Sequence, residues 1–167
     1  MDINEITAML DSYVSFVKTE SPETIENINI NDVIKDCVKK IDKKKYSLKI
    51  KEENIIQTSG RPIQLKRAFQ NIIDNSKRYA HKIEISLYIN ENGCNVEVND
   101  NGQGIPKENY EDVFKPFFTL DPSRNKLKGE SGLGLTISRD IIRSHGGEIN
   151  LGQSYLGGLK ILISLPI

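Results

Sequence analysis

Four groups of residues in this chain of 167 amino acids have types and spacings suited to chemistry. The first group holds Asn71 and Asn75, which would share one face of a helix because they lie four residues apart. An amide oxygen is a hard, neutral ligand that suits Mg²⁺, which takes oxygen ligands and keeps several waters. Lys77 and Arg78 follow in the sequence and can meet phosphate charge. Taken alone, the two asparagines also fit a helix surface that merely faces solvent.

The second group lies in the run VNDNGQGIP, residues 98–106, where Asp100 closes an alternating, strand-like segment. Gly102 and Gly104 let the backbone pass close to a flat ligand because they carry no Cβ. A carboxylate in a partly apolar pocket accepts a hydrogen bond from the amino group of adenine, whereas guanine presents a carbonyl there. Asp100 would therefore favour ATP over GTP. The alternative is a surface turn, since Asp-Asn-Gly is a common turn sequence.

The third group consists of Phe114, Phe117 and Phe118, which are three of the five phenylalanines in the chain. A polar stretch, residues 119–130, follows them. We expect the aromatic side chains to pin one end of this stretch, which would otherwise be mobile. The alternative is that these aromatics form a core strand.

The fourth group is the glycine-rich run GESGLGLTIS, residues 129–138, which opens an expected helix. The free N–H groups at the start of a helix bind anions, so this run predicts a phosphate site. It is not a Walker A loop, because no Gly-Lys-Ser/Thr occurs. It is not a dinucleotide fingerprint either, because no acidic residue ends a following strand. A structural glycine-rich turn is the alternative.

Helices and strands are interleaved along the part of the chain that must position these groups. Asn31 is expected to cap the helix predicted over 30–41, and Pro62 suits the first turn of the helix predicted over 61–79. Asn92-Gly93 predicts a hairpin between two strands. Hairpin signals outnumber crossovers, so the fold class is an α/β sandwich with a mixed sheet covered by helices on one face. Spacing predicts helices over 30–41, 61–79, 135–144 and a short one near 108–113, and strands over 46–51, 54–58, 82–90, 94–99, 147–152 and 158–165.

A further helix is predicted over residues 2–17, before a boundary at Ser21-Pro22. Its apolar residues form a narrow stripe of the kind found in a helical bundle or coiled coil. The alternative is an ordinary core helix of a single domain. The stripe consists of Ile3, Ile6, Leu10, Tyr13 and Val17.

The composition is that of one globular domain with a short appendage. Lys plus Arg and Asp plus Glu both number 23, so the net charge is zero, which argues against a dedicated nucleic-acid binder. Cys37 and Cys94 have no zinc-site spacing, and a reduced cytoplasmic setting is expected. The lysines at 43–45 suggest either an acidic partner or, preferably, a solvated turn.

In this order and spacing, the four groups resemble the N box, first glycine box, F box and second glycine box of the histidine-kinase ATP-binding domain. That domain shares a superfamily with DNA gyrase B, Hsp90 and MutL, and the resemblance covers residues 22–167. The ending HGGEI, residues 145–149, favours the kinases, and RAFQNIIDNSKRYA, residues 67–80, looks closest to the EnvZ-like branch. The resemblance implies a two-layer α/β sandwich (the Bergerat fold) with a mostly antiparallel mixed sheet, and it implies ATP and Mg²⁺ as ligands.

The resemblance also implies a role for each matching residue. Asn75 would hold the Mg²⁺ that bridges the ATP phosphates, and Asp100 would recognise the adenine amino group. Asn75, Arg78 and the lid residue Arg124 would be the catalytic set. Further contacts with the nucleotide are implied for Asn71, Lys77, Tyr79, Gly102, Gly104, Ile105, Phe117, Gly132, Leu133, Gly134 and Leu135.

Residues 115–131 would form the ATP lid of such a domain. Many relatives have Arg after the aromatic residues of the F box, where this chain has Thr119. This departure puts part of the γ-phosphate clamp in doubt. Lys126 or Lys128 would be the residues to compensate for it.

Residues 1–20 resemble the second helix of the dimerisation and phosphotransfer hairpin, so the catalytic domain would occupy residues 21–167. His81 and His145 are not in the context of a phosphoacceptor histidine, so the chain is not expected to autophosphorylate alone. The implied partners are the hairpin domain and, indirectly, a response regulator, with weak self-association through the first helix. The fragment would be cytoplasmic and its parent anchored in the bacterial inner membrane.

Three functions remain open from the sequence. The first is the catalytic domain of a two-component sensor histidine kinase, which donates the γ-phosphate of ATP to a histidine. The second is a serine protein kinase of the anti-sigma type, against which the bundle-like first helix counts. The third is a nucleotide-binding interaction module without catalysis.

Overall fold

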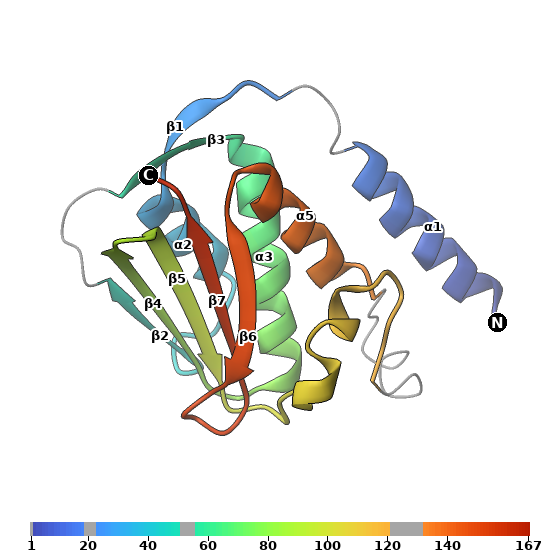
Figure 1. Cartoon of the computed structure of the whole chain (residues 1–167). Coiled ribbons are helices and arrows are strands. Elements are labelled where there is room, and N and C mark those ends of the chain that lie inside the picture. The colour runs from blue at the N-terminus through green and yellow to red at the C-terminus, as the bar shows by residue number, and fades with distance from the viewer. Residues whose placement is uncertain (1, 19–22, 51–55, 121–131) are drawn as a thin grey trace.

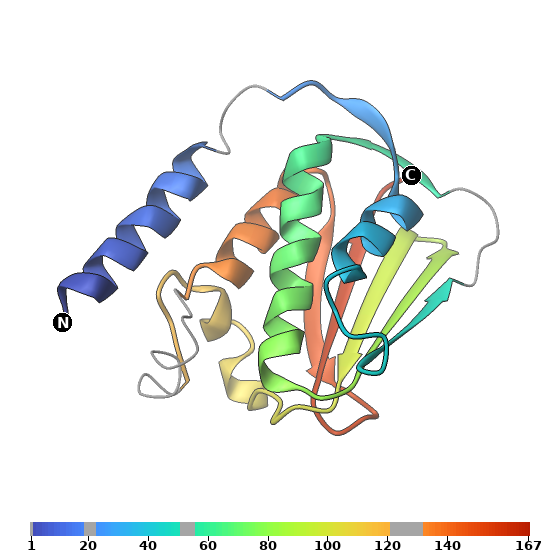
Figure 2. The same ribbon diagram turned by 180° about the vertical axis from the view of Figure 1, so that it is seen from behind.

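A computed structural model describes residues 2–18, 23–50, 56–120 and 132–167 of the chain. Its main body has two layers, a five-stranded sheet and helices that cover one face of that sheet (Figures 1 and 2). The helix α1 (Ile3–Lys18) lies beside this body. The expected α/β sandwich with helices on one face is therefore confirmed.

The sheet has the strand order β2-β4-β5-β7-β6. β2 (Tyr46–Ile50) runs parallel to β4 (Ile83–Asn90), and every other pair is antiparallel. This arrangement confirms the mixed, mostly antiparallel sheet. The remaining strands are β5 (Gly93–Asp100), β6 (Glu148–Gln153) and β7 (Leu159–Leu165).

The β4–β5 hairpin forms as predicted, but its turn lies one residue earlier than the expected Asn92-Gly93. Glu91 and Asn92 make the turn, and Gly93 is already paired with Asn90. Gly93 has φ 111°, and a Cβ there would overlap the carbonyl oxygen of Leu165. The glycine is thus required by a close strand neighbour as well as by the turn.

Three helices pack on the sheet: α2 (Ile30–Val38), α3 (Pro62–Tyr79) and α5 (Gly134–Ser144). Alternate residues of each strand point toward these helices, because strand side chains have a period of two. The core between the layers therefore consists of one apolar face of the sheet and one apolar stripe from each helix. Its largest fully buried side chains include Phe69, Ile72, Ile85, Leu87, Ile142 and Ile161.

A second, two-stranded sheet pairs β1 (Glu26–Asn29) with β3 (Gln57–Gly60). β3 lies further along the chain than the predicted strand 54–58, of which only Ile56 onward is described. The predicted N-cap of α2 was wrong: the side chain of Asn29, not Asn31, accepts the free N–H, at 3.0 Å from the nitrogen of Asn31. The helix begins at Ile30, as the predicted range 30–41 has it, and ends earlier, at Val38, because the asparagine that ends β1 provides the cap and a turn follows Val38.

The short helix expected near 108–113 is a pair of 3₁₀ turns, η1 (Lys107–Asn109) and η2 (Asp112–Phe114). The predicted helices over 61–79 and 135–144 are confirmed as α3 and α5, and Pro62 stands at the start of α3. Among the described helices, none is both long and apolar enough to cross a membrane.

Candidate functional site

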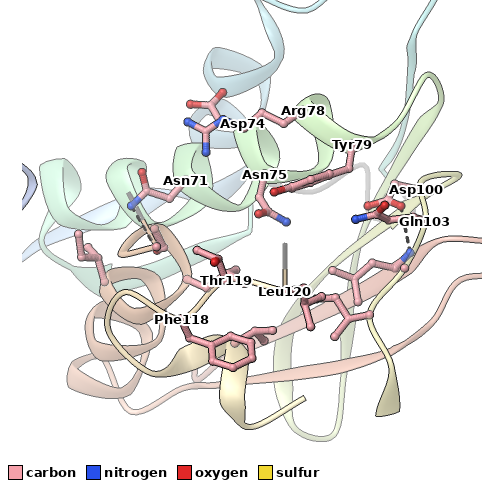
Figure 3. Close-up of a pocket in the computed structure, with 18 of the residues that line it drawn as sticks. Asn71, Asp74, Asn75, Arg78, Tyr79, Asp100, Gln103, Phe118, Thr119 and Leu120 are labelled. Carbon is pink, nitrogen blue, oxygen red and sulfur yellow. Dashed lines mark hydrogen bonds between the residues drawn. The ribbon is translucent and has the colours of Figure 1, made fainter. Parts of the chain in front are cut away.

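A cavity of about 400 Å³ opens between α3, the end of β5, the segment after η2 and the start of α5 (Figure 3). It gathers residues from all four groups, although Asn71 and Leu135 lie 64 positions apart in the chain. The predicted site residues that line it are Asn71, Asn75, Arg78, Tyr79, Asp100, Gly104, Ile105, Gly132, Gly134 and Leu135.

Asp100 lies at one end of the cavity with only 2% of its surface exposed. Its Oδ1 accepts hydrogen bonds from the backbone N–H groups of Gly102 and Leu159, both at 2.9 Å. These bonds fix the carboxylate, while Oδ2 makes no hydrogen bond within the described part of the chain. The carboxylate therefore offers one oxygen as an acceptor to a ligand at this end.

Glycines make room for this arrangement. A Cβ at Gly158 would overlap Oδ1 of Asp100, and one at Gly102 would lie 2.8 Å from the carbonyl oxygen of Tyr79. The N–H of Gly158 also donates to the backbone oxygen of Asp100 at 3.0 Å. Any side chain at Gly158 would displace the carboxylate, so this glycine shapes the cavity although it was not among the predicted site residues.

Asn71 and Asn75 lie along α3 and point toward the cavity, as the spacing predicts (Figure 3). The side-chain amide of Asn71 donates to the backbone oxygen of Gly134 at 3.5 Å. The amide of Asn75 makes no hydrogen bond within the described residues and lies between Tyr79 and Thr119. Its oxygen is therefore available to a ligand or a cation.

The donor set fits a magnesium ion that is shared with a ligand better than a metal held by protein alone. Within the described residues, no three His, Cys, Asp or Glu side chains cluster to hold a metal. Mg²⁺ commonly uses one or two protein oxygens and completes its shell with phosphate oxygens and water. An available amide oxygen in an open cavity meets that requirement.

The start of α5 forms the wall of the cavity next to Asn71. Gly132, just before the helix, has φ 72°, and a Cβ there would lie 2.8 Å from the Cα of Phe117. Leu133 stands at the N-cap without a side-chain cap, so no side chain of the cap competes for the first N–H groups. These groups carry the positive end of the helix dipole toward the cavity and suit an anion.

The two ends of the expected lid are joined beside this helix start. The N–H of Phe117 donates to the backbone oxygen of Gly132 at 2.9 Å. Phe114 is buried, its backbone oxygen accepts from the hydroxyl of Thr136 at 2.7 Å, and Arg139 stacks 4.5 Å from its ring centre. The aromatic group is therefore an anchor rather than a core strand, and residues 121–131 lie outside the described residues.

Four described residues of the predicted set do not line this cavity. Lys77 lines an adjoining groove on the other side of α3. Gly102 lies under the backbone of Tyr79, Leu133 is buried, and Phe117 is 43% exposed. Arg124, like Lys126 and Lys128, lies outside the described residues.

Sequence reasoning missed several residues that the structure brings to the cavity. Leu159 contributes its backbone N–H to Asp100 from 59 positions away, and a backbone group leaves no trace in residue type. Thr119 was considered only as a departure from the family pattern, yet it lines the cavity near Asn75 (Figure 3). Phe118, of the third group, also lines the cavity. The other lining residues that were not predicted as site residues are Asp11, Arg67, Asp74, Gln103, Val113, Leu120 and Ile137.

Neither histidine lies in the cavity. His145 caps the end of α5, its Nε2 accepts the N–H of Arg61 at 3.0 Å, and its Nδ1 lies 2.7 Å from the backbone oxygen of Ile141. His145 therefore has a structural role, and His81 is exposed. Burial raises the pKa of Cys37 to about 11 and that of Cys94 to about 12, so both thiols are inert.

Comparison with known proteins agrees with this geometry. The sequence pattern of the family "Histidine kinase-, DNA gyrase B-, and HSP90-like ATPase" matches residues 60–167. The chain is 38% identical over 109 residues to the sensor histidine kinase CpxA of Escherichia coli, covering 65% of this chain and 24% of CpxA. It is 28% identical over 173 residues to the sensor protein RstB of the same organism, covering 99% of this chain and 40% of RstB.

Solved structures show the same fold. The catalytic domain of histidine kinase ThkA, at 25% identity, has a TM-score of 0.73 over 86% of this chain and 97% of that domain. The mycobacterial sensor histidine kinase MprB has a TM-score of 0.73 at 24% identity, over 86% of this chain and 97% of that one. The chain thus spans between 24% and 40% of the lengths of CpxA and RstB. The chain belongs to the family of histidine kinase-, DNA gyrase B- and Hsp90-like ATPases, and it has the ATP-binding catalytic domain of the sensor histidine kinases.

Proposed function

We propose that this domain serves a two-component sensor histidine kinase by binding MgATP and donating the γ-phosphate to a histidine of a phosphotransfer hairpin. The observation that carries the proposal is the placement of Asp100 and Asn75 in one cavity, with a glycine-flanked helix start beside Asn75. Asp100 supplies an acceptor for a base, Asn75 a ligand for a cation, and the helix start a site for an anion. A nucleoside triphosphate with Mg²⁺ presents these three features together.

The adenine would lie at the Asp100 end of the cavity. Oδ2 of Asp100 would accept the amino group, and Tyr79 and Ile105 would contact the base or the sugar. GTP would be rejected because its carbonyl would face the carboxylate oxygen without a proton between them. Gly102 would not contact the nucleotide, and its backbone N–H would hold Oδ1 of Asp100 in place.

The phosphates would lie between α3 and the start of α5. Asn75 would hold Mg²⁺ with Asn71 beside it, and the N–H groups that follow Leu133 would bind phosphate oxygens. Arg78 would approach the phosphates, and Arg124 of the lid would join them from outside the described residues. Bound Mg²⁺ would neutralise phosphate charge.

Phosphoryl transfer to histidine needs a histidine as nucleophile, and neither His81 nor His145 lines this cavity. A histidine nitrogen of the hairpin would attack the γ-phosphorus, the bond to the β-phosphate oxygen would break, and ADP would leave. The residues of this domain would contribute by positioning ATP and stabilising charge. The amide of Asn75 and the first N–H groups of α5 can do both without reacting themselves.

The same proposal covers the organisation of the parent protein. Residues 1–20 would belong to the second helix of the hairpin, residues 21–167 to the catalytic domain, and residues 115–131 to its lid. A response regulator would receive the phosphoryl group from the hairpin histidine. The catalytic domain would work in the cytoplasm, with its parent anchored in the bacterial inner membrane.

The deciding experiment incubates the chain with γ-labelled ATP and the separately expressed hairpin of its parent kinase. We expect label on the hairpin that is lost in acid and kept in alkali, as phosphohistidine is, and no label with Asn75→Ala. Acid-stable label on a serine would instead identify the anti-sigma type of kinase. ATP binding without transfer to the hairpin would leave only the non-catalytic interaction module.

A further inference from the structure

A groove of about 790 Å³ runs between the end of α2 and the outer face of α3, beside the nucleotide cavity. Figure 2 shows these two helices next to each other on the side away from the sheet. Lysine and arginine supply almost all the charge of the groove. Its cationic residues are Lys40, Lys66, Arg67, Lys77 and Arg78, and Asp74 is its one carboxylate among the described lining residues.

The positive charge is local, because the whole chain has 23 basic and 23 acidic side chains. At the edge of the groove, the carboxylate of Asp36 lies 2.6 Å from the ammonium of Lys39 and 2.8 Å from that of Lys66. The hydrogen bond with Lys39, followed by that with Lys66, lowers the pKa of Asp36 to about 2. Asp36 thus faces two ammonium groups, so these three side chains together carry one net positive charge.

Two further lysines of the groove have no such partner. The ammonium groups of Lys40 and Lys77 make no ion pair or hydrogen bond within the described part of the chain. Both side chains are exposed, that of Lys40 in the turn after α2 and that of Lys77 near the end of α3. Lysines left in this state on two walls of one groove can pair with anionic groups that enter it.

The shape of the groove selects the kind of anion. Lining residues recur along α3 from Ile63 to Arg78 at helical spacing, which corresponds to roughly 22 Å at 1.5 Å per residue. Ile63 is 73% exposed at one end and adds an apolar contact. A length of about four helical turns, with cations on both walls and an apolar end, suits an acidic amphipathic helix.

We propose that this groove docks an acidic helix of a partner protein. A phosphate backbone or an anionic membrane presents a uniform negative surface, which Asp74 within the groove would repel. A protein helix can place a neutral or basic side chain opposite Asp74 and carboxylates opposite Lys40 and Lys77. The concave shape between two helices also fits a protein ridge better than a flat bilayer.

The docking surface lies next to the nucleotide cavity without depending on it. Arg67, Asn71, Asp74 and Arg78 line both depressions, so an occupant of the groove contacts side chains that face the cavity as well. The inference goes beyond the proposed function, because the charge and shape that carry it are present without a nucleotide.

The test measures binding of the full chain to a fluorescein-labelled, eighteen-residue helical peptide of glutamate, alanine and leucine by fluorescence anisotropy. We expect saturable binding that weakens with added salt, and no binding of a peptide in which glutamine replaces glutamate. Lys40→Glu with Lys77→Glu is expected to weaken binding at least tenfold. The single variant Lys40→Gln, which makes the smaller change, is expected to weaken it about threefold.

A matched control carries the same charge change elsewhere, with Lys49→Glu and Lys107→Glu on exposed positions outside the groove. This control should bind the peptide within twofold of the unaltered chain, and thermal unfolding should show both double variants folded. Equal loss of binding in the two double variants would overturn the proposal. So would a preference for a DNA duplex or for phosphatidylglycerol vesicles over the acidic peptide.

Discussion

At the scale of single residues, the candidate site depends on the carboxylate of Asp100, of which one oxygen is hydrogen-bonded to the backbone. Two N–H groups, from Gly102 and Leu159, hold Oδ1 of Asp100, and only Oδ2 is left for a ligand. Recognition of a base by a fixed acceptor is selective, because a carbonyl in place of the amino group leaves two acceptors facing each other. The selectivity therefore depends on which group occupies the Oδ2 position.

Asp100→Asn should reverse this selectivity. The amide oxygen can still accept from Gly102 and Leu159, which leaves the NH₂ group at the position of Oδ2. We expect ATP to bind roughly tenfold to a hundredfold more weakly and GTP to bind more tightly than to the unaltered chain. Competition with a fluorescent nucleotide checks both changes. An unchanged ATP to GTP ratio would show that Asp100 does not read the base.

A substitution at Thr119 is expected to strengthen ATP binding rather than weaken it. Thr119 lines the cavity near Asn75. The family resemblance of the sequence leads us to expect an arginine at this position. Thr119→Arg should strengthen ATP binding roughly threefold to tenfold and ADP binding much less, since the guanidinium would meet the γ-phosphate. Calorimetry with both nucleotides measures the difference, with Thr119→Ser as the control. Equal gains for ATP and ADP would place the arginine elsewhere.

Residue types and spacing predicted candidate residues whose own side chains line the cavity. Asn71, Asn75 and Asp100 are recognisable because their chemistry and their intervals are both visible in the sequence. Leu159 and Gly158 were not predicted as site residues, because Leu159 contributes only a backbone N–H and Gly158 contributes only the space that a side chain would fill. Such contributions become visible only when the strand β7 is placed beside β5.

At the scale of elements, the site depends on how α3 and α5 are held together. The hydroxyl of Ser138 donates to the backbone oxygen of Ala68 at 2.9 Å, and Asn71 donates to Gly134 at 3.5 Å. At the far end of α5, His145 accepts the N–H of Arg61, just before α3 begins. α5, with its candidate anion site, is therefore tied to α3 at both of its own ends.

The tie at His145 predicts a dependence of stability on pH. Burial is the largest cause that lowers the pKa of His145 below its ordinary value of 6.5, and Nε2 must stay unprotonated to accept the Arg61 N–H. The unfolded chain then binds a proton that the folded chain resists, so this stability is complete above about pH 6.5 and falls as the pH drops below it.

His145→Gln should remove part of this loss, because glutamine keeps an acceptor and does not titrate. The measurement is the free energy of unfolding by urea at about pH 7 and about pH 5.5, where histidine changes charge. His81→Gln, at an exposed position, is the control and should behave as the unaltered chain does. The same pH dependence in the His145 variant and the unaltered chain would assign the effect to other groups.

Helices were easier to predict than their ends. The apolar spacing of α3 and α5 is set by packing on the sheet, and it is read directly from the sequence. The cap of α2 was misplaced because Asn29 and Asn31 are both good caps, and the end of β1 decides between them. The strand β3 was shifted because its pairing with β1 is a contact between distant segments, which local pattern does not report.

At the scale of the whole molecule, α1 stands out because its apolar stripe faces solvent. Ile3 is 78% exposed, Leu10 56% and Tyr13 54%, whereas the apolar stripes of α3 and α5 are buried. The narrow stripe that predicted a bundle helix is therefore not covered within the described residues. An exposed stripe of this kind favours association with another helix.

We therefore predict weak self-association through α1. Sedimentation velocity at increasing concentration should show a growing dimer fraction, and Leu10→Asp should reduce it. Ala8→Asp places the same charge on the helix away from the stripe and should leave the dimer fraction nearly unchanged. A chain that stays monomeric at the highest concentration reached would contradict this prediction.

The central claim, that Asp100 reads adenine and Asn75 holds the magnesium of a bound ATP, is tested most directly by isothermal titration calorimetry. The unaltered chain should bind ATP more tightly with Mg²⁺ than without it. Asn75→Ala should abolish that gain from Mg²⁺, and Asp100→Ala should abolish the preference for ATP over GTP. If both variants bind MgATP as the unaltered chain does, the assignment of this cavity is wrong.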